Sequence, residues 1–587
     1  MIDVTRRTVL VGAATGVAAA EIDPASLAQA APPSGGMEPL TSTDGVFTPA
    51  KGRGIQKFSF SNPEPSIHFA GLLFAFEVIS FENNFGVDPV TVTIERGVDR
   101  VRLTATGLRW AGGHEKKAGR ISAELRRSAA GAIEWAVQAA IDEPIKAIKT
   151  IVRGLPRGRI SLAAEGWRDF GDDEQVFEYP ALNGGMATPL AVIEGQDKRF
   201  WGISALQSEV RPARFAFLPG PDGYKTELVY EAGAWERPQA AKTCDWRILA
   251  APDFASVAKT HFDWVAKSWR LPDFQQRADA PDWMKKIALV LSLHGQHWTG
   301  YIHNDFDRQL EILRWAAKQI EPRNVMVFLN GWDARYYWDY PRFEVGARTG
   351  GEAAFALLVR KAKALGYRIA IMFGSNVARR NGPDFPKIAD ARLRDDYGDF
   401  FPANYVDWNG DRKGDGFMVF MNLAVASWRN HLRDRIAGII GRYAIDAYFL
   451  DICGLWENNL DGDMLVGTRQ LVEELAQRFP GVAPIAEMQY DAQMGFIPMS
   501  HVPRYSLYPQ ANFGVVASFN HLSFPAPGRG STGIHEYGFG RYQPVTLDQP
   551  QIPTITFVDD TFTTQREAVM SDIAIAKRRF AARGGRT

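Results

Sequence analysis

The chain contains very little cysteine, because Cys244 and Cys453 are the only two among its 587 residues. Two distant thiols exclude a disulfide framework, and neither lies in a spacing typical of a zinc site. Net charge is also absent, since 67 basic residues balance 67 acidic ones. No overall field therefore favours nucleic acid or an anionic membrane surface as a partner.

Long apolar runs and nucleotide fingerprints are missing as well. No run of about 18 or more apolar residues occurs, which excludes an integral membrane segment from the mature chain. No G-x-G-x-x-G pattern follows the first strand of the C-terminal half, which argues against a dinucleotide cofactor. We therefore expect no obligatory cofactor.

Aromatic residues, in contrast, are plentiful, at 36 Phe, 17 Tyr and 16 Trp. Tryptophan suits stacking on sugar rings, but large cores also consume aromatics, so composition leaves both uses open. The length exceeds what one hydrophobic core organises, so we expect at least two domains.

The N-terminus has the features of an export signal. Paired arginines, Arg6 and Arg7, precede the Ala- and Gly-rich segment VLVGAATGVAAA, and Ala28-Gln29-Ala30 forms an A-x-A cleavage site. Residues 1–30 resemble a bacterial twin-arginine (Tat) signal peptide, which predicts cleavage after Ala30 and a periplasmic or secreted protein. A disordered Ala-rich leader is the alternative. Residues 31–50 read as a linker.

Residues 51–260 are predicted to form an antiparallel β-sandwich. Apolar and polar residues alternate at period two, and Gly, Asp or Asn interrupt the segments. The clearest segments are 90–97, 100–110, 119–129, 133–142, 198–207 and 225–234. Residues 261–284 are predicted to contain a linking helix, stopped by Pro272.

Residues 285–587 follow a different pattern, in which buried strands alternate with amphipathic helices. The predicted strands are 285–295, 324–333, 367–376, 446–454 and 482–491, with 515–524 and 553–560 as candidates for later ones. This alternation predicts a parallel sheet covered on both faces, and its length fits a (β/α)8 TIM barrel. A doubly wound open sheet is the competing fold.

Two predicted strands end in an acid. Asp451 ends the run AYFLD, and Glu487 ends PIAE, 36 residues later, which is the length of one βα unit. The two acids should therefore lie at equal depth on adjacent strands, at the mouth where barrels place active sites. Such a pair serves retaining glycoside hydrolysis, with one acid ionised and the other, Glu487, held protonated by apolar neighbours. Structural pairing with barrel arginines is the alternative.

The segment FMVFMNLAVASWRNHLRDRIAGIIGRYAIDAYFLD, residues 417–451, resembles the stretch that leads to the nucleophile in retaining α-glycosidase barrels. The shared features are Asn422, the helix with Trp428, and the ending Y-x-I-D-x-x-F-L-D. In the dextranase and endo-α-N-acetylgalactosaminidase type, the nucleophile Asp lies on strand four and the acid/base Glu on strand five. The resemblance implies that Asp451 is the nucleophile and Glu487 the acid/base.

Other polar and aromatic residues near strand ends are candidates for binding a carbohydrate substrate, although an ordinary loop role is as plausible for each. These candidates are Trp298, Asn330, Trp332, Asp333, Asn376, Arg379 and Trp456. His294 and His297 lack the helical spacing and third ligand of a zinc site, and residues 407–416 lack the final Glu of a calcium loop, so no metal is expected.

The sequence thus predicts an exported glycoside hydrolase that acts on an α-linked glycan, in carbohydrate metabolism or polysaccharide degradation. A non-catalytic carbohydrate-binding protein and, more remotely, a Tat-exported redox enzyme are the alternatives. Neither the sugar nor the linkage follows from the sequence.

Overall fold

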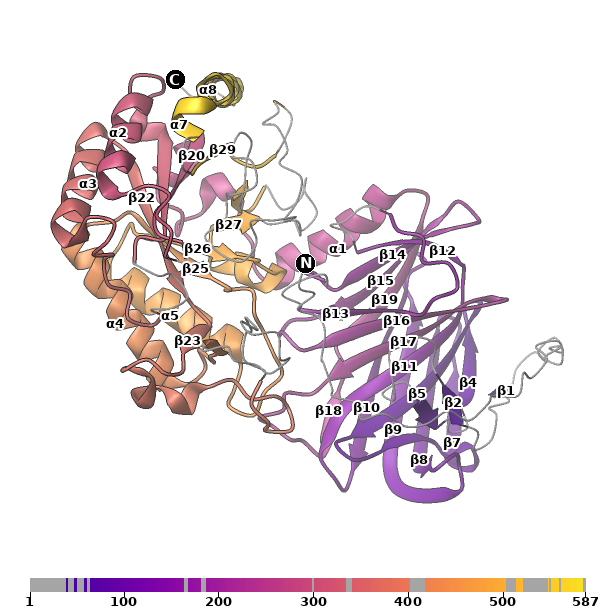
Figure 1. The fold of residues 1–587 in the computed structure, drawn as a ribbon. Helices are drawn as coiled ribbons and strands as arrows, with labels where there is room; N and C mark the ends of the chain where they lie inside the picture. Colours follow the sequence, from indigo (N-terminus) through magenta and orange to yellow (C-terminus); the bar gives the residue numbers. More distant parts are fainter. Residues whose placement is uncertain are drawn as a thin grey trace, which may run out of the picture.

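The structure is a computed structural model in which a sandwich of strands precedes a barrel of strands and helices (Figure 1). It describes residues 38–40, 47–49, 58–60, 64–162, 167–180, 186–297, 300–333, 340–401, 418–502, 514–520, 547, 550–558 and 561–583. Within these ranges no helix combines the length and apolarity needed to cross a membrane.

The N-terminal half forms a 17-stranded antiparallel sheet that folds into two layers. Its strands are β1 (Glu38–Leu40), β4 (Glu64–Phe69), β5 (Leu72–Ser80), β6 (Asn84–Val87), β7 (Val92–Arg96), β8 (Arg100–Trp110), β9 (Glu115–Arg127), β10 (Ile133–Ile141), β11 (Ile145–Leu155), β12 (Gly158–Ser161), β13 (Gln175–Tyr179), β14 (Leu190–Gly195), β15 (Phe200–Leu206), β16 (Ala213–Gly220), β17 (Gly223–Glu231), β18 (Ala240–Lys242) and β19 (Asp245–Ala251). A separate two-stranded sheet joins β2 (Phe47–Pro49) to β3 (Phe58–Phe60).

Tryptophans fill the space between the two layers. Trp135 of β10 packs against Phe74 of β5, with ring centroids 5.2 Å apart, and its indole N–H donates to Thr150 Oγ1 over 3.1 Å. Trp246 of β19 packs edge-on against Phe215 of β16 at 5.4 Å. These contacts join strands of opposite layers, as in a β-sandwich, which confirms the predicted architecture of this half.

The linking helix α1 (Phe254–Ser268) begins earlier than the range 261–284 predicted for it. The Asp253 side chain accepts a hydrogen bond from the Ser256 amide over 2.7 Å and so caps the helix at its start. After Ser268 the chain leaves helical geometry, with a left-handed residue at Arg270. Pro272 therefore lies beyond the helix and does not end it.

The C-terminal half is an eight-stranded parallel sheet with helices on its outside (Figure 1). The strands are β20 (Leu289–His294), β21 (Val325–Asn330), β22 (Arg368–Gly374), β25 (Ala447–Asp451), β26 (Ala483–Glu487), β27 (Met499–Val502), β28 (Ala517–Asn520) and β29 (Thr554–Phe557). The helices are α2 (Phe306–Ala316), α3 (Gly351–Leu365), α4 (Ala426–Tyr443), α5 (Met464–Arg478), α7 (Thr561–Thr564) and α8 (Arg566–Ala582). β23 (Val377–Arg379) and β24 (Met418–Phe420) form a small antiparallel pair beside it.

The sheet closes on itself as a barrel. Its order runs from β28 through β25 and β20 to β29, and a parallel bridge between Phe519 and Ile552 joins the two ends. The predicted (β/α)8 barrel is therefore confirmed. The sixth strand, β27, is absent from the sequence prediction, because it is only four residues long and includes a histidine.

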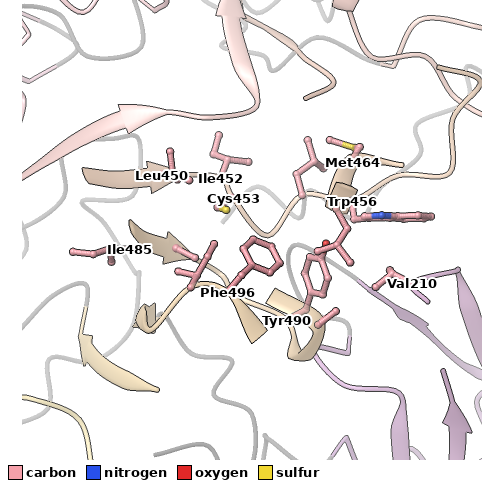
Figure 2. Close-up of a cluster of buried hydrophobic side chains, with 14 of the residues drawn as sticks. Val210, Leu450, Ile452, Cys453, Trp456, Met464, Ile485, Tyr490 and Phe496 are labelled. Carbon is pink, nitrogen blue, oxygen red and sulfur yellow. The ribbon is translucent and has the colours of Figure 1, made fainter. Parts of the chain in front are cut away.

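The sandwich packs against loops that follow the barrel strands. The Asn458 side chain donates to Glu231 Oε2 over 3.0 Å and to the Ala232 carbonyl over 2.9 Å, and it accepts from the Ala234 amide over 2.8 Å. Figure 2 shows Val210 of the sandwich in one apolar cluster with Tyr490 of a barrel loop. The sandwich thus supports the loops beside the two acids.

Candidate active site

Asp451 and Glu487 are the last residues of the neighbouring parallel strands β25 and β26. The residues before them, Leu450 and Ala486, are direct partners in the ladder, so both acids lie at the same level. Their carboxyl groups share a hydrogen bond. Both side chains are buried, at 1% and 8% exposure, and within the described ranges neither forms an ion pair with lysine or arginine. The structure thus brings together the two acids that the sequence singled out.

A left-handed residue follows each acid. Ile452 has φ of 58° and Met488 has φ of 52°. This conformation is rare for a β-branched side chain and costs roughly 1–2 kcal/mol. It turns the Ile452 amide toward Glu487, whose Oε2 accepts a hydrogen bond from it over 2.7 Å. The Ile452 amide therefore fixes the Glu487 carboxyl group relative to strand β25.

Burial controls the protonation of the pair. It raises the pKa of Asp451 well above its ordinary value, and the negative charge of Glu487 raises it further. Burial also raises the pKa of Glu487, whereas hydrogen bonds from Asp451 and from the Ile452 amide act in the opposite sense. Burial and the mutual repulsion of two neighbouring carboxylates therefore both favour a pair that shares one proton. The pKa of both acids is thus raised, and not that of Glu487 alone.

His501 is a residue that the sequence analysis missed. It pairs with Glu487 in the parallel ladder between β26 and β27, and its Nδ1 lies 3.9 Å from Glu487 Oε1. Its ring packs between Phe449 and Phe519 inside the barrel, at centroid distances of 5.1 and 5.0 Å. Only recognition of the short strand β27 would have placed this histidine beside the acid.

Two predicted substrate residues lie at the same end of the barrel. Asn330 ends β21 and is buried, and its amide nitrogen lies 3.3 Å from Nε2 of His294 at the end of β20. Asp333 is also buried, and its charge contributes to the raised pKa of Asp451, so it lies near the acid pair. Both side chains thus lie at the end of the barrel that carries the acid pair.

Two predicted sugar-stacking tryptophans have other positions. Trp332 is 1% exposed, stacks on Phe355 of α3, and donates its indole N–H to the Met372 carbonyl over 2.8 Å. Gly331, with φ of 65°, turns the chain just before it, so the side chain points into the layer between strand and helix. The stacking role is therefore wrong for Trp332.

Trp456 lies at the boundary with the sandwich. Its ring contacts Trp235 edge-on at 6.4 Å, and its N–H donates to Asp463 Oδ1 over 3.0 Å. Figure 2 shows Trp456 in the apolar cluster with Met464 and Tyr490. It is 4% exposed, so its ring packs at the domain boundary in this structure.

The remaining candidates are an amide, an arginine and a third tryptophan. Asn376 is buried and donates to the Ile452 carbonyl over 3.0 Å, so it supports the turn after Asp451. Arg379 is half-buried, donates to Asn381 Oδ1 over 2.6 Å, and lines a cavity of about 100 Å³ together with Tyr340. Trp298 lies outside the described residues.

No metal centre accompanies the acids in the described part of the chain. His294 and His297 are both buried, but no group of three or more His, Cys, Asp or Glu side chains there is arranged to hold an ion. A cavity of about 730 Å³ lies at the opposite end of the barrel, lined by Ala288, Asn324 and Pro553, each close before a strand. In this fold that end serves stability and the other end carries the chemistry.

Comparison with known proteins finds this architecture in other solved structures. No protein-family model matches the sequence, and no curated protein matches it. The ligand-free α-N-acetylgalactosaminidase from Bifidobacterium bifidum is similar in structure, with a TM-score of 0.59 and 12% identity over 87% of this chain and 93% of that one. Its complex with Gal-NHAc-DNJ gives a TM-score of 0.62 at 11% identity, over the same shares.

A more distant likeness joins the chain to a GH36 α-galactosidase from Geobacillus stearothermophilus in complex with raffinose. The TM-score is 0.50 and the identity 12%, over 92% of this chain and 80% of that one. At such identities the likeness establishes the fold, namely a β-sandwich followed by a (β/α)8 barrel. The fold expected from the α-glycosidase resemblance is therefore confirmed.

Proposed function

We propose that the protein is a retaining α-glycosidase in which Asp451 is the nucleophile and Glu487 the acid/base. The observation that carries this proposal is the hydrogen-bonded carboxyl pair at the ends of two adjacent barrel strands. Retaining hydrolysis needs two carboxyl groups about 5–5.5 Å apart, with an anomeric carbon between them. Two carboxyl groups that share a hydrogen bond lie closer than that, so the entering sugar has to separate them and break their hydrogen bond.

The reaction then proceeds in two steps, formation and hydrolysis of a glycosyl ester. Asp451 forms an ester bond to the anomeric carbon while the bond to the leaving oxygen breaks, and Glu487 gives its proton to that oxygen. In the second step Glu487 takes a proton from water, the water oxygen attacks the anomeric carbon, and the Asp451 carboxylate is released. Positive charge on the sugar in each transition state favours the ionised form of Asp451.

The substrate we propose is a sugar with the configuration of galactose, either an α-N-acetylgalactosaminide or an α-galactoside. The support is the similarity of the whole architecture to an α-N-acetylgalactosaminidase and, more weakly, to an α-galactosidase. Oδ1 of Asn330 accepts no hydrogen bond from the described residues, so this buried oxygen can accept one from a sugar hydroxyl. Asp333 supplies a further acceptor beside the pair.

The experiment that tests the proposal assays D451N and E487Q on aryl α-glycosides, with the N-acetylgalactosaminide and the galactoside first. Both variants should lose nearly all activity, and azide should restore turnover of an activated glycoside by E487A. The matched control is D446N, because Asp446 lies just before the same strand but pairs with Lys363 and Arg368 over 2.8 and 3.3 Å. D446N should lower stability and keep activity. Full activity in D451N or E487Q would refute the assignment.

A carbohydrate-binding protein without catalysis gives a different pattern. It would bind the same glycans and release no reducing ends, and D451N would weaken binding without changing any rate. Glycan binding by the wild type without release of aglycone would therefore replace the proposed hydrolase with this alternative.

We further propose that the protein is exported through the twin-arginine pathway and cleaved after Ala30, as the paired Arg6 and Arg7 suggest. Fractionation of cells that express the full chain, followed by N-terminal sequencing, tests this directly. The mature protein should begin at Ala31 in the periplasm or medium. The variant R6K/R7K should stay in the cytoplasm, and export of that variant at the wild-type level would contradict the proposal.

A further inference from the structure

Tyr340 lies on the connection between β21 and α3 and is almost completely buried, at 1% exposure. Its ring lies against Gly374, the ladder partner of Asp451, and its hydroxyl lowers the pKa of the Asp451 carboxyl group. Neither the sequence pattern nor the likeness to other proteins singles out this tyrosine. Its position makes it a direct neighbour of the proposed nucleophile.

Gly374 provides the space that the Tyr340 ring occupies. It is the last residue of β22 and the direct ladder partner of Asp451. A Cβ atom at this position would lie 2.0 Å from Cε2 and 2.2 Å from Cδ2 of Tyr340, which no side chain can tolerate. Gly374 is not among the glycines with positive φ. The backbone therefore does not require glycine here, whereas the tyrosine ring does.

Other contacts hold the ring in place. The Tyr340 ring packs on Phe343 at a centroid distance of 5.1 Å, and Phe343 packs in turn on Phe373 of β22 at 5.2 Å. The Tyr340 carbonyl accepts a hydrogen bond from the Arg379 amide over 2.9 Å. The hydroxyl is thus presented to Asp451 from a packed support and not from a free loop.

We propose that Tyr340 is the positioning residue of Asp451, and that Gly374 exists at the end of β22 to admit its ring. The inference rests on the proposed function and deepens it. The Tyr340 hydroxyl donates to the carboxylate, fixes its orientation, and favours its ionised form.

The chemistry gives this hydrogen bond a specific purpose. The groups that act on Asp451 from neighbouring elements are Glu487, Asp333 and Tyr340. The two acids and burial favour the protonated form of Asp451, which cannot attack a sugar. Among the described residues that act on Asp451, Tyr340 acts in the opposite sense, because a hydroxyl donor stabilises the carboxylate without adding charge. Loss of this donor should therefore leave Asp451 protonated over a wider range of pH.

The test compares Y340F with Y367F across pH. Tyr367 is an equally buried tyrosine of the barrel, but its hydroxyl donates to the Leu313 carbonyl over 2.8 Å, away from the acids. Y340F should lower kcat/KM by about 10- to 100-fold, as expected for one hydrogen bond to a charged group. The acidic limb of the kcat/KM profile of Y340F should move to higher pH. Y367F should reduce thermal stability and leave the limb unchanged.

G374A supplies the second arm of the test. The added methyl group displaces the Tyr340 ring, so G374A should shift the acidic limb in the same direction as Y340F. The double variant Y340F/G374A should be no worse than G374A alone, because both substitutions remove the same contact. Additive losses, or an unchanged limb in Y340F, would overturn the proposal.

A readout independent of turnover separates this inference from the proposed function. Infrared difference spectra should contain a band from the protonated Asp451 carboxyl group, identified by its loss in D451N. In Y340F this band should persist to higher pH than in the wild type. If the band moves while D451N retains activity, Tyr340 positions Asp451 but the hydrolase mechanism is wrong. If the band does not move, the positioning role is wrong even where the hydrolase is right.

Discussion

The backbone amide of Ile452 donates a hydrogen bond to Oε2 of Glu487 over 2.7 Å. Strand β25 therefore supplies one acid, Asp451, and with its next residue holds the other. The left-handed backbone at Ile452, with φ of 58°, is what turns this amide toward the neighbouring strand. A strained β-branched residue at this point is typical of a site where geometry is favoured over local stability.

The first prediction concerns the pH dependence of activity. Burial raises the pKa of both Asp451 and Glu487 from their ordinary values of 3.8 and 4.5. The productive enzyme has one proton on the pair, so the acidic limb of kcat/KM should lie above these values and the profile should be bell-shaped. Rates measured from pH 3 to 9 on one aryl glycoside check this. An acidic limb at or below pH 4 would contradict a buried, interacting pair.

The second prediction tests the position of Trp332. Since its indole stacks on Phe355 and donates to the Met372 carbonyl, W332F removes a buried hydrogen bond and some packing. We expect the free energy of unfolding to fall by about 1–3 kcal/mol, with KM unchanged. Urea unfolding and steady-state kinetics on one preparation measure both. A tenfold rise in KM without loss of stability would restore the stacking role.

The third prediction concerns the ends of two barrel helices. Helix α4 ends at the exposed Ala444, whose φ of 53° and ψ of 45° are left-handed, whereas α3 ends at Gly366 with φ of 110°. A444G should raise the free energy of unfolding by about 1 kcal/mol without affecting activity, since glycine adopts this conformation without steric cost.

The reverse substitution, G366A, is the matched control. Its Cβ would lie 3.1 Å from Cγ of Arg323 in a backbone conformation that alanine avoids. It should lower the free energy of unfolding by about 1–3 kcal/mol. Thermal unfolding of both variants measures these changes in stability. An A444G variant with unchanged stability would show that the strain at the end of α4 is relieved elsewhere.

The fourth prediction uses a buried acid at the domain boundary. Burial raises the pKa of Asp491 to about 6, and Thr188 donates to it over 2.9 Å. A carboxyl group with a raised folded pKa binds protons more tightly when folded, so stability falls as pH rises from about 4 to about 6. In D491N the side-chain amide oxygen can still accept the hydrogen bond from Thr188, but the side chain no longer titrates.

We therefore expect D491N to gain about 3 kcal/mol relative to the wild type between pH 4 and pH 7. Urea unfolding of both proteins at intervals of pH measures this difference. Parallel stability curves would mean that Asp491 is ionised in the folded protein without cost.

Much of the architecture could be predicted from the sequence, because period-two alternation and buried strand runs report local burial directly. The segment 133–142 alternates, and β10 covers Ile133–Ile141 with buried and exposed residues in turn. The pairing of Asp451 with Glu487 followed from one βα unit between two acidic strand ends. Both inferences use only the chain between neighbouring elements.

The direction of side chains after strand ends could not be predicted in the same way. A single left-handed residue, such as Gly331 before Trp332, reverses the face on which the next side chain lies. The contact of Tyr340 with Gly374 depends on how a loop folds back over another strand, which no spacing in the sequence encodes. His501 was missed for a simpler reason, since a four-residue strand has too few positions to show a period.

The most direct measurement is to trap the covalent intermediate on the enzyme. The wild type is treated with a slow-reacting fluorinated glycosyl fluoride of the sugar that it cleaves best, and peptide mass mapping locates the adduct. The account predicts a glycosyl ester on Asp451, formed in the wild type and absent from D451N. An adduct on any other residue, or turnover that releases the inverted anomer without an adduct, would contradict it.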